Sequence, residues 1–425
     1  MNIGRINKFY FYAYTGRKCG SIIIRYTLSK IIDSDKLAHA VNLTLRGYPF
    51  LRLTPAVSRD GDITFSENRE RCTVYPLDNN RRRLGTADTN GYMFAVRAAD
   101  NIIEITAFHG FGDVRAINSF TAAVLLRYLS LVDETLVKVD AIDEPQESAE
   151  ETLYEKCLPF RGRLSANRYK KKNVFVIPTD TPLTGTPEFH VFRVKYPLDQ
   201  FLSKVKDMNG SPTSFLSTLI AESISSICDI SDDIVTASVP VDMRRILDSN
   251  AQSNFTVNAD LPFFNEETCL KFEQRVMRQK QFLAEQISRD NLISAVISYG
   301  DLVEDVMKAP LSDKETVEML QRKTIEAARN QKTYLLTNVG PLKFPEYAMK
   351  HIINADVTLP LIEDSPIACV TAFGNTGCIN RIQNNDESLL INTIKDTFVK
   401  LGIDAQLIDE GRTASDTVEP YLYVK

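Results

Sequence analysis

Short β-branched runs and stretches of helical periodicity alternate through the first third of the chain. Residues 21–28 (SIIIRYTL) predict a strand, and Asp33-Ser34-Asp35 is a typical helix start ahead of apolar positions at helical spacing. A second apolar helix is expected after Asp113. Two hairpins are predicted in this part, at residues 50–66 around Arg59–Asp62 and at residues 93–108 around Ala99–Asn101.

The second half repeats this alternation without Gly-rich turns between strands and helices. Strands are predicted at residues 189–194, 235–241, 334–339, 367–373 and 378–382, and helices at residues 198–206, 214–227, 265–299 and 389–401. The absence of Gly-rich strand-to-helix turns favours two α/β sandwiches over a doubly wound nucleotide fold.

A change of composition separates the two halves. Residues 141–187 are first acidic, then basic and proline-containing, with few apolar positions, which is typical of a connector. The pattern therefore predicts an N-terminal lobe at 1–140, a connector at 141–187 and a C-terminal lobe at 188–425.

Composition narrows the class of protein. A net charge of -5 gives no overall attraction to phosphate backbones, so we expect no nucleic-acid partner. Seven scattered cysteines without C-x-x-C spacing favour reduced thiols over disulfides or a zinc site. No signal-peptide core and no run of about 20 apolar residues is found, so a soluble, cytoplasmic protein without a membrane partner is expected.

Histidine chemistry has few possible locations. Motifs for phosphate loops, dinucleotide folds, zincins and serine-hydrolase elbows are absent, and no metal is expected. Of the four histidines, His39, His190 and His351 are interpreted as structural or surface residues. His109 ends a predicted strand in His109-Gly-Phe-Gly-Asp113, where Asp113 has the position of a helix N-cap.

This motif and its surroundings resemble the coenzyme A-dependent acyltransferase superfamily, which includes chloramphenicol acetyltransferase, the BAHD and alcohol acyltransferases, and condensation domains. The spacing matches the His-x-x-x-Asp motif. Further matches follow in family order, at Tyr48-Pro-Phe-Leu-Arg52, Ser238-Val-Pro-Val-Asp-Met-Arg-Arg245, Thr337-Asn-Val-Gly340 and the late hairpin at residues 367–382.

The resemblance implies two chloramphenicol-acetyltransferase-like lobes with a tunnel between them. It also implies that His109 is the general base and that Asp113 pairs with Arg244 to hold the loop that presents His109. Phe108 and Val114 stand where many members have a second histidine and a glycine, and the BAHD motif D-F-G-W-G is replaced by Ala372-Phe-Gly-Asn-Thr-Gly377.

Two further sets of residues are candidates from their position in the pattern. For the oxyanion donor or tunnel lining they are Asn254, Asn258 and Thr371, with Thr256, Thr337 and Asn338 as alternatives. For the coenzyme A phosphates they are Arg161, Arg163 and Lys170 on the connector, next to Lys171 and Lys172; a solvated basic loop is the alternative, as it is for Arg81-Arg-Arg83.

The expected function is transfer of an acetyl or other short acyl group from acyl-coenzyme A, as co-substrate, to a small-molecule alcohol or amine. Two alternatives remain: condensation on thioesters of a partner carrier protein, and a non-catalytic relative that keeps the fold. No bound cofactor is expected, and a monomer suffices because one chain already supplies both lobes.

Overall fold

The computed structural model describes most of the chain. The residues described are 20–57, 63–78, 80–133, 152–178, 188–307, 332–359, 367–383, 386–414 and 416–418, with Asn7, Tyr10, Phe11, Glu315, Met319 and Arg322. The predicted turn at 59–62 and parts of the predicted connector lie outside them. No helix among the described residues is both long and apolar enough to cross a membrane.

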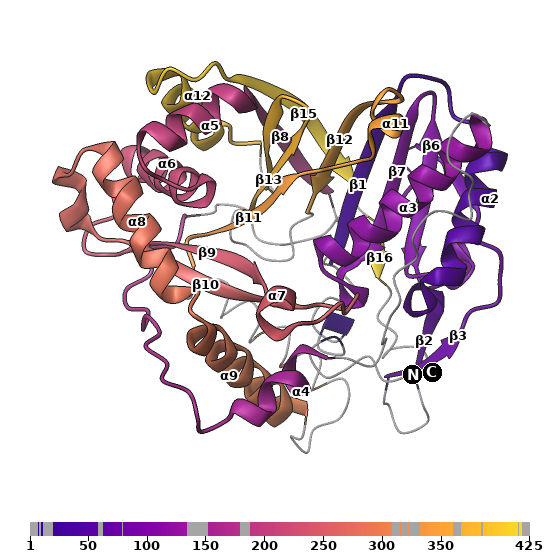
Figure 1. Cartoon of the computed structure of the whole chain (residues 1–425), viewed down its shortest axis with the longest axis horizontal. Helices are drawn as coiled ribbons and strands as arrows, with labels where there is room; N and C mark the ends of the chain where they lie inside the picture. The colour runs from indigo at the N-terminus through magenta and orange to yellow at the C-terminus, as the bar shows by residue number, and fades with distance from the viewer. Residues whose placement is uncertain are drawn as a thin grey trace.

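The first lobe is a five-stranded sheet with helices on one face (Figure 1). Its strand order is β12-β1-β7-β6-β4. The strands are β1 (Ser21–Leu28), β4 (Val74–Pro76), β6 (Phe94–Ala99), β7 (Ile102–Phe108) and β12 (Ile352–Thr358). The helices are α2 (Ser34–Thr44) and α3 (Val114–Val132).

Alternation along the strands decides which face the helices cover. Ile22, Ile24 and Tyr26 of β1 are buried in the apolar core shared with α2 and α3, whereas Arg25 faces Glu104 of β7 on the other side of the sheet. The first lobe therefore presents a charged sheet face to the second lobe.

The second lobe is built on a seven-stranded mixed sheet of order β10-β9-β11-β13-β14-β8-β15. Its strands are β8 (Glu188–Pro197), β9 (Val235–Asp242), β10 (Thr256–Phe263), β11 (Tyr334–Pro341), β13 (Ile367–Phe373), β14 (Thr376–Gln383) and β15 (Gln406–Ala414). The accompanying helices are α5 (Leu198–Asp207), α6 (Pro212–Ile227), α8 (Phe272–Gln286) and α12 (Leu389–Lys400). Side chains of these helices and strands share a second apolar core.

Shorter elements complete the two lobes. The strands are β2 (Leu53–Val57), β3 (Ile63–Glu67), β5 (Arg83–Leu84) and β16 (Thr417–Val418), and the helices are α7 (Arg244–Leu247) and α11 (Glu346–Met349). Single 3₁₀ turns are η1 (Leu45–Gly47), η2 (Pro49–Arg52), η3 (Ala87–Thr89), η4 (His109–Phe111), η6 (Leu158–Phe160) and η7 (Asn265–Cys269).

The prediction of one helix over residues 265–299 was wrong. The segment forms η7, α8 and then α9 (Arg289–Met307), with a break at Ile287 and Ser288. Ile287 leaves the helical region (φ -87°, ψ 13°), and Ser288 accepts the Leu292 N–H through its carbonyl oxygen at the start of the next helix. No glycine or proline stands between Leu283 and Leu292, so the pattern alone did not reveal the break.

The connector contains an ordered helix. α4 (Leu153–Cys157) packs against α9 in a third apolar cluster, which also includes Met243 and Phe255 from the connection between β9 and β10. Gly300 of α9 makes this packing close, because a Cβ there would lie 2.0 Å from Cδ2 of Tyr154.

The two lobes exchange chain segments. β12 follows the second-lobe strand β11 in sequence but pairs antiparallel with β1 in the first sheet, and β16 pairs with β5. The predicted lobe boundaries at residues 140 and 188 stay a prediction. The first sheet includes residues 352–358, so the first lobe of the structure is not one continuous range of sequence.

Candidate active site

His109 sits where strand β7 ends and turns toward helix α3. The N–H of His109 donates to the carbonyl of Gly20 at 2.6 Å, which extends the β1–β7 pairing, and the chain then makes the turn η4. Two glycines allow a tight turn. A Cβ at Gly110 would lie 2.2 Å from the Phe108 ring, and one at Gly112 would lie 3.1 Å from the carbonyl oxygen of Gln252.

The imidazole of His109 lies in a largely apolar setting. The ring of Tyr10 stacks on it, with centroids 4.9 Å apart and an interplanar angle of 18°. Its Nδ1 is buried and makes no hydrogen bond in the part of the chain that the structure describes. Burial lowers the pKa of His109, and this is only partly opposed by its own carbonyl oxygen, by Asp113 and by Asn254. At neutral pH the ring is therefore uncharged.

Asp113 lies four residues on and points into the protein. Its carboxylate caps α3 by accepting the Ala116 N–H at 3.0 Å and also accepts the Phe255 N–H at 2.9 Å. Arg244 forms a two-point pair with it, Nη1 to Oδ2 at 2.8 Å and Nη2 to Oδ1 at 3.1 Å. Both side chains are about 96% buried. The pair thus connects the motif loop to the second lobe.

The segment between β9 and β10 holds this arrangement from the other side. Arg244 donates to the carbonyls of Ala251 and Ser253, at 2.6 and 2.8 Å. Asn254 donates through Nδ2 to the carbonyl of His109 at 2.7 Å and to Oδ1 of Asn7 at 3.0 Å. The loop carrying His109 is consequently fixed by residues from both halves of the chain.

The structure gathers only part of the predicted set. His109, Asp113, Arg244 and Asn254 are linked by the contacts above, whereas no contact among the described residues joins the other candidates to His109. Thr371 is buried within β13, and Asn258 is exposed on β10.

The basic candidates lie on the connector. Arg161 forms a two-point ion pair with Asp301 of α9, at 2.5 and 2.9 Å, and also donates to the hydroxyl of Tyr154. Arg163 and Lys170 are exposed. Lys171 pairs with Asp260 at 2.9 Å, and burial lowers its pKa.

Asn7 and Tyr10 are contacts of the site that the sequence did not reveal. Tyr10 lies in the aromatic run Phe9-Tyr-Phe-Tyr12, and Asn7 lies just before it; this part of the sequence carries no motif. Phe11 is fully buried against Phe108 and Phe111, which anchors this segment beside the motif loop. A run of aromatic residues ahead of the first strand was the available signal.

Comparisons with known proteins give the fold. No family model and no curated protein matches the chain by sequence. Among solved structures, TRI3 trichothecene 15-O-acetyltransferase from Fusarium sporotrichioides matches with a TM-score of 0.60 and 12% identity, covering 94% of this chain and 93% of that one. TRI101 from F. sporotrichioides, complexed with coenzyme A and T-2, matches with a TM-score of 0.60 and 10% identity, covering 95% and 99%.

A third likeness comes from a different kind of protein. The epimerization domain from the third module of tyrocidine synthetase B matches with a TM-score of 0.60 and 10% identity, covering 94% of this chain and 95% of that one. The chain therefore has the two-lobed α/β fold that TRI3, TRI101 and this epimerization domain share, which confirms the fold expected from the sequence.

Proposed function

We propose that the chain is an acyltransferase that moves an acyl group from acyl-coenzyme A to a hydroxyl or amine, with His109 as general base. The observation that carries the proposal is an uncharged imidazole, held at the end of β7 by a loop fixed from both lobes. One fold can host many kinds of chemistry, and the fold shared with TRI3 and TRI101 favours acyl transfer among them.

The reaction needs one proton transfer in each direction. Nδ1 of His109 is the buried nitrogen, so Nε2 is the nitrogen that takes the proton from the acceptor O–H or N–H. The freed oxygen or nitrogen attacks the thioester carbonyl carbon and forms a tetrahedral adduct. As that adduct collapses, the C–S bond breaks, and the imidazolium returns its proton to the departing thiolate. General base catalysis of this kind contributes about 100- to 10,000-fold.

Some of the other residues hold the loop that carries His109, and the rest are candidates for contacts with the substrates. Asp113 and Arg244 act by holding the loop, because the Asp113 oxygens are occupied by four N–H donors of the protein. Asn254 is a positioning residue in the same sense, since its amide group donates to the His109 carbonyl. Asn258 and Thr371 remain candidates for the tunnel or oxyanion donor, and Arg163 and Lys170 for the coenzyme A phosphates.

The test is release of free thiol from acetyl- and longer acyl-coenzyme A in the presence of a panel of alcohols and amines. We expect thiol release by the wild type and its loss in His109→Ala, while His39→Ala, an exposed histidine on α2, keeps full activity. Thiol release that is equal in wild type and His109→Ala would refute the assignment.

Condensation on a carrier-bound thioester is the second candidate, and the likeness to an epimerization domain of a peptide synthetase supports it. The same residues serve as base and support, so only the donor differs. Activity with a loaded carrier protein but not with acyl-coenzyme A would select this alternative. A folded protein inactive with both donors and every acceptor would indicate the non-catalytic relative.

A further inference from the structure

A second polar site lies in the seam between the two sheets, apart from the His109 loop. It is a cavity of about 390 Å³ whose walls come from β1 and β7 of the first sheet, from the first-sheet strand β12, and from β8 and β15 of the second sheet. Its charged lining residues are Arg25, Arg81, Arg193, Arg412, Glu104 and Glu410. A volume of this order is typical of a small-molecule site.

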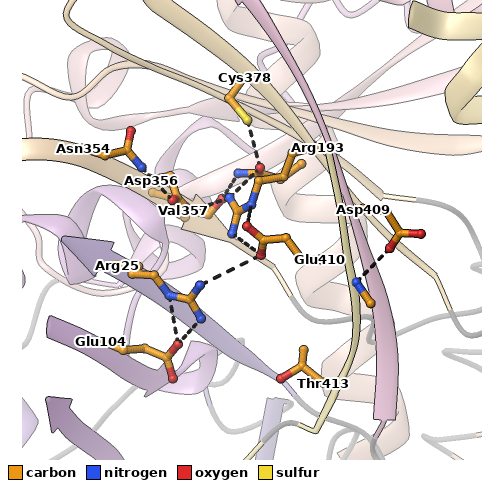
Figure 2. Close-up of polar contacts among 12 residues, drawn as sticks. Arg25, Glu104, Arg193, Asn354, Asp356, Val357, Cys378, Asp409, Glu410 and Thr413 are labelled. Carbon is orange, nitrogen blue, oxygen red and sulfur yellow. Dashed lines mark hydrogen bonds and ion pairs between the residues drawn. The ribbon is translucent and has the colours of Figure 1, made fainter. Parts of the chain in front are cut away.

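The charged wall of the cavity is a chain of ion pairs that crosses the seam (Figure 2). Arg25 binds Glu104 through Nε and Nη2, at 3.3 and 2.7 Å, and its Nη1 lies 3.9 Å from Glu410. Arg193 binds the same Glu410 at two points, 2.6 and 3.0 Å, and Asp356 at 2.7 Å. The 3.9 Å between Arg25 and Glu410 is an ion-pair distance that is too long for a hydrogen bond, and both residues line the cavity.

Positive charge is in excess on the lining. Four arginines and two glutamates line the cavity, an excess of two positive charges. Asp356 and Asp386 are not lining residues, but they bind Arg193 and Arg412. Arg25 and Arg81, which share Glu104, are therefore the arginines that an added anion would meet. Arg81 donates to Glu104 at 3.2 Å and to the hydroxyl of Thr413 at 2.8 Å, so this guanidinium also joins the first sheet to β15.

An irregularity in strand β15 places Glu410 in the seam. The register of β15 on β8 shifts between Asp409 and Gly411, so Glu410 is the extra residue of a β-bulge. Gly411 has φ of 75°, a left-handed conformation that favours glycine. A regular strand would have continued the alternation and turned this residue elsewhere.

Part of the lining is apolar and lies beside the arginines, because Ile23 and Arg25 are two residues apart on β1, and Val191 and Arg193 are two residues apart on β8. Ile23, Phe189 and Val191 are each at least 93% buried and form one small cluster with Ile382. A ligand that fits this lining has an anionic head for the guanidinium groups and an apolar body for the cluster. Arginine recognises carboxylates with two parallel hydrogen bonds, and a carboxylate suits the exposed edge of Arg25.

We propose that this seam cavity, lined by Arg25, Arg81 and the Ile23–Phe189–Val191 wall, binds a small organic carboxylate with an apolar body. The ligand contacts both lobes at once and adds to the ion-pair chain between them. Binding here is a property of the cavity and does not require acyl transfer by His109.

Calorimetry on the purified full chain tests the proposal with three probes: phenylacetate, its neutral analogue phenylacetamide, and inorganic phosphate. We expect saturable binding of phenylacetate, and binding of phenylacetamide and phosphate that is weaker by about tenfold or more, because the amide lacks the charge and phosphate lacks the apolar body.

Two variants with opposite expected effects and one matched control sharpen the test. Arg25→Gln should weaken phenylacetate binding by about tenfold or more, whereas Glu410→Gln should strengthen it, since it removes a negative charge from the lining. Arg52→Gln makes the same change in net charge at a side chain of equal exposure, 30% against 32%, and should leave binding unchanged.

Several results would overturn the proposal. Equal binding of phenylacetamide and phenylacetate would remove the role of the charge, and no saturable binding of phenylacetate would remove the site. Preferential binding of phosphate would replace the carboxylate by a different anion. If Arg25→Gln is unstable, judged by its thermal midpoint, the Glu410→Gln result decides alone: unchanged or weaker binding contradicts the assignment.

Discussion

Replacing Asp113 by asparagine tests whether this carboxylate supports the fold of the active site or the chemistry. The substitution keeps the size of the side chain but removes its charge and turns one acceptor oxygen into an NH₂ donor. That donor then faces N–H groups of Arg244, Ala116 or Phe255. Arg244, itself about 96% buried, keeps one partner of opposite charge, Asp242, at 3.0 Å.

The magnitude follows from this burial. Breaking one side of a buried ion pair costs about 3–5 kcal/mol, because the other charge is left without its counter-ion. Against a typical total of about 5–15 kcal/mol, this is a large fraction of the unfolding free energy. Asp242→Asn is the matched control: that carboxylate contacts the same Arg244 but is one-third exposed, so its loss should cost about 0–1 kcal/mol.

Urea unfolding followed by far-UV circular dichroism measures the difference, since the chain has no tryptophan to report by fluorescence. We expect Asp113→Asn to unfold at a much lower urea concentration than Asp242→Asn, and to retain acyl transfer at temperatures where it stays folded. A variant as stable as wild type but inactive would refute the positioning role and point to a direct part in the reaction.

Three further predictions concern pH and packing. Burial lowers the His109 pKa, so kcat/KM should be flat through neutral pH and fall only below pH 6.5, as the ring becomes protonated; a midpoint above 6.5 would contradict this. His190 lies between Asp386 and Asp409. Desolvation lowers its pKa, but the two aspartates outweigh this effect, so the pKa of His190 in the folded protein is raised above 6.5. The stabilisation that the charged ring gives to the folded state is therefore complete below pH 6.5 and is lost as the pH rises through the folded-state pKa. Thermal midpoints from pH 5 to 9 should show this loss in wild type and not in His190→Gln. Gly300→Ala should lower the thermal midpoint, because the added methyl group overlaps the Tyr154 ring, although alanine is the better helix former; Ser298→Ala, exposed on the same helix, should have little effect.

The parts of the site that depend on neighbouring residues could be predicted from the sequence. The hairpin that ends at His109 turns at Asp100, an aspartate in the left-handed region at φ 48°, and Asp113 caps the next helix through its own side chain. Both signals are local: a turn residue and an N-cap followed by apolar positions at helical spacing. The strand, the motif turn and the helix therefore follow from about 40 contiguous residues.

Contacts between distant parts of the chain could not be predicted in this way. The role of Arg244 was expected only through the family resemblance, because the sequence around it does not indicate a partner 131 residues away. Tyr10 and Asn7 belong to a segment without a motif, and their contacts with the site depend on how the whole first lobe packs. Propensity and periodicity describe local structure, whereas these contacts are decided by tertiary packing.

Strand β12 also bears on how substrates could reach the space between the sheets. Six residues of β12 pair with β1, although the two strands are more than 300 residues apart in the sequence. The next strand along the chain, β13, belongs to the second sheet. Because β11 and β13 belong to the second sheet, the chain crosses from one sheet to the other before and after β12. These two crossings limit how far the sheets can separate, so we expect a ligand to reach the space between them without a wide opening of the two lobes.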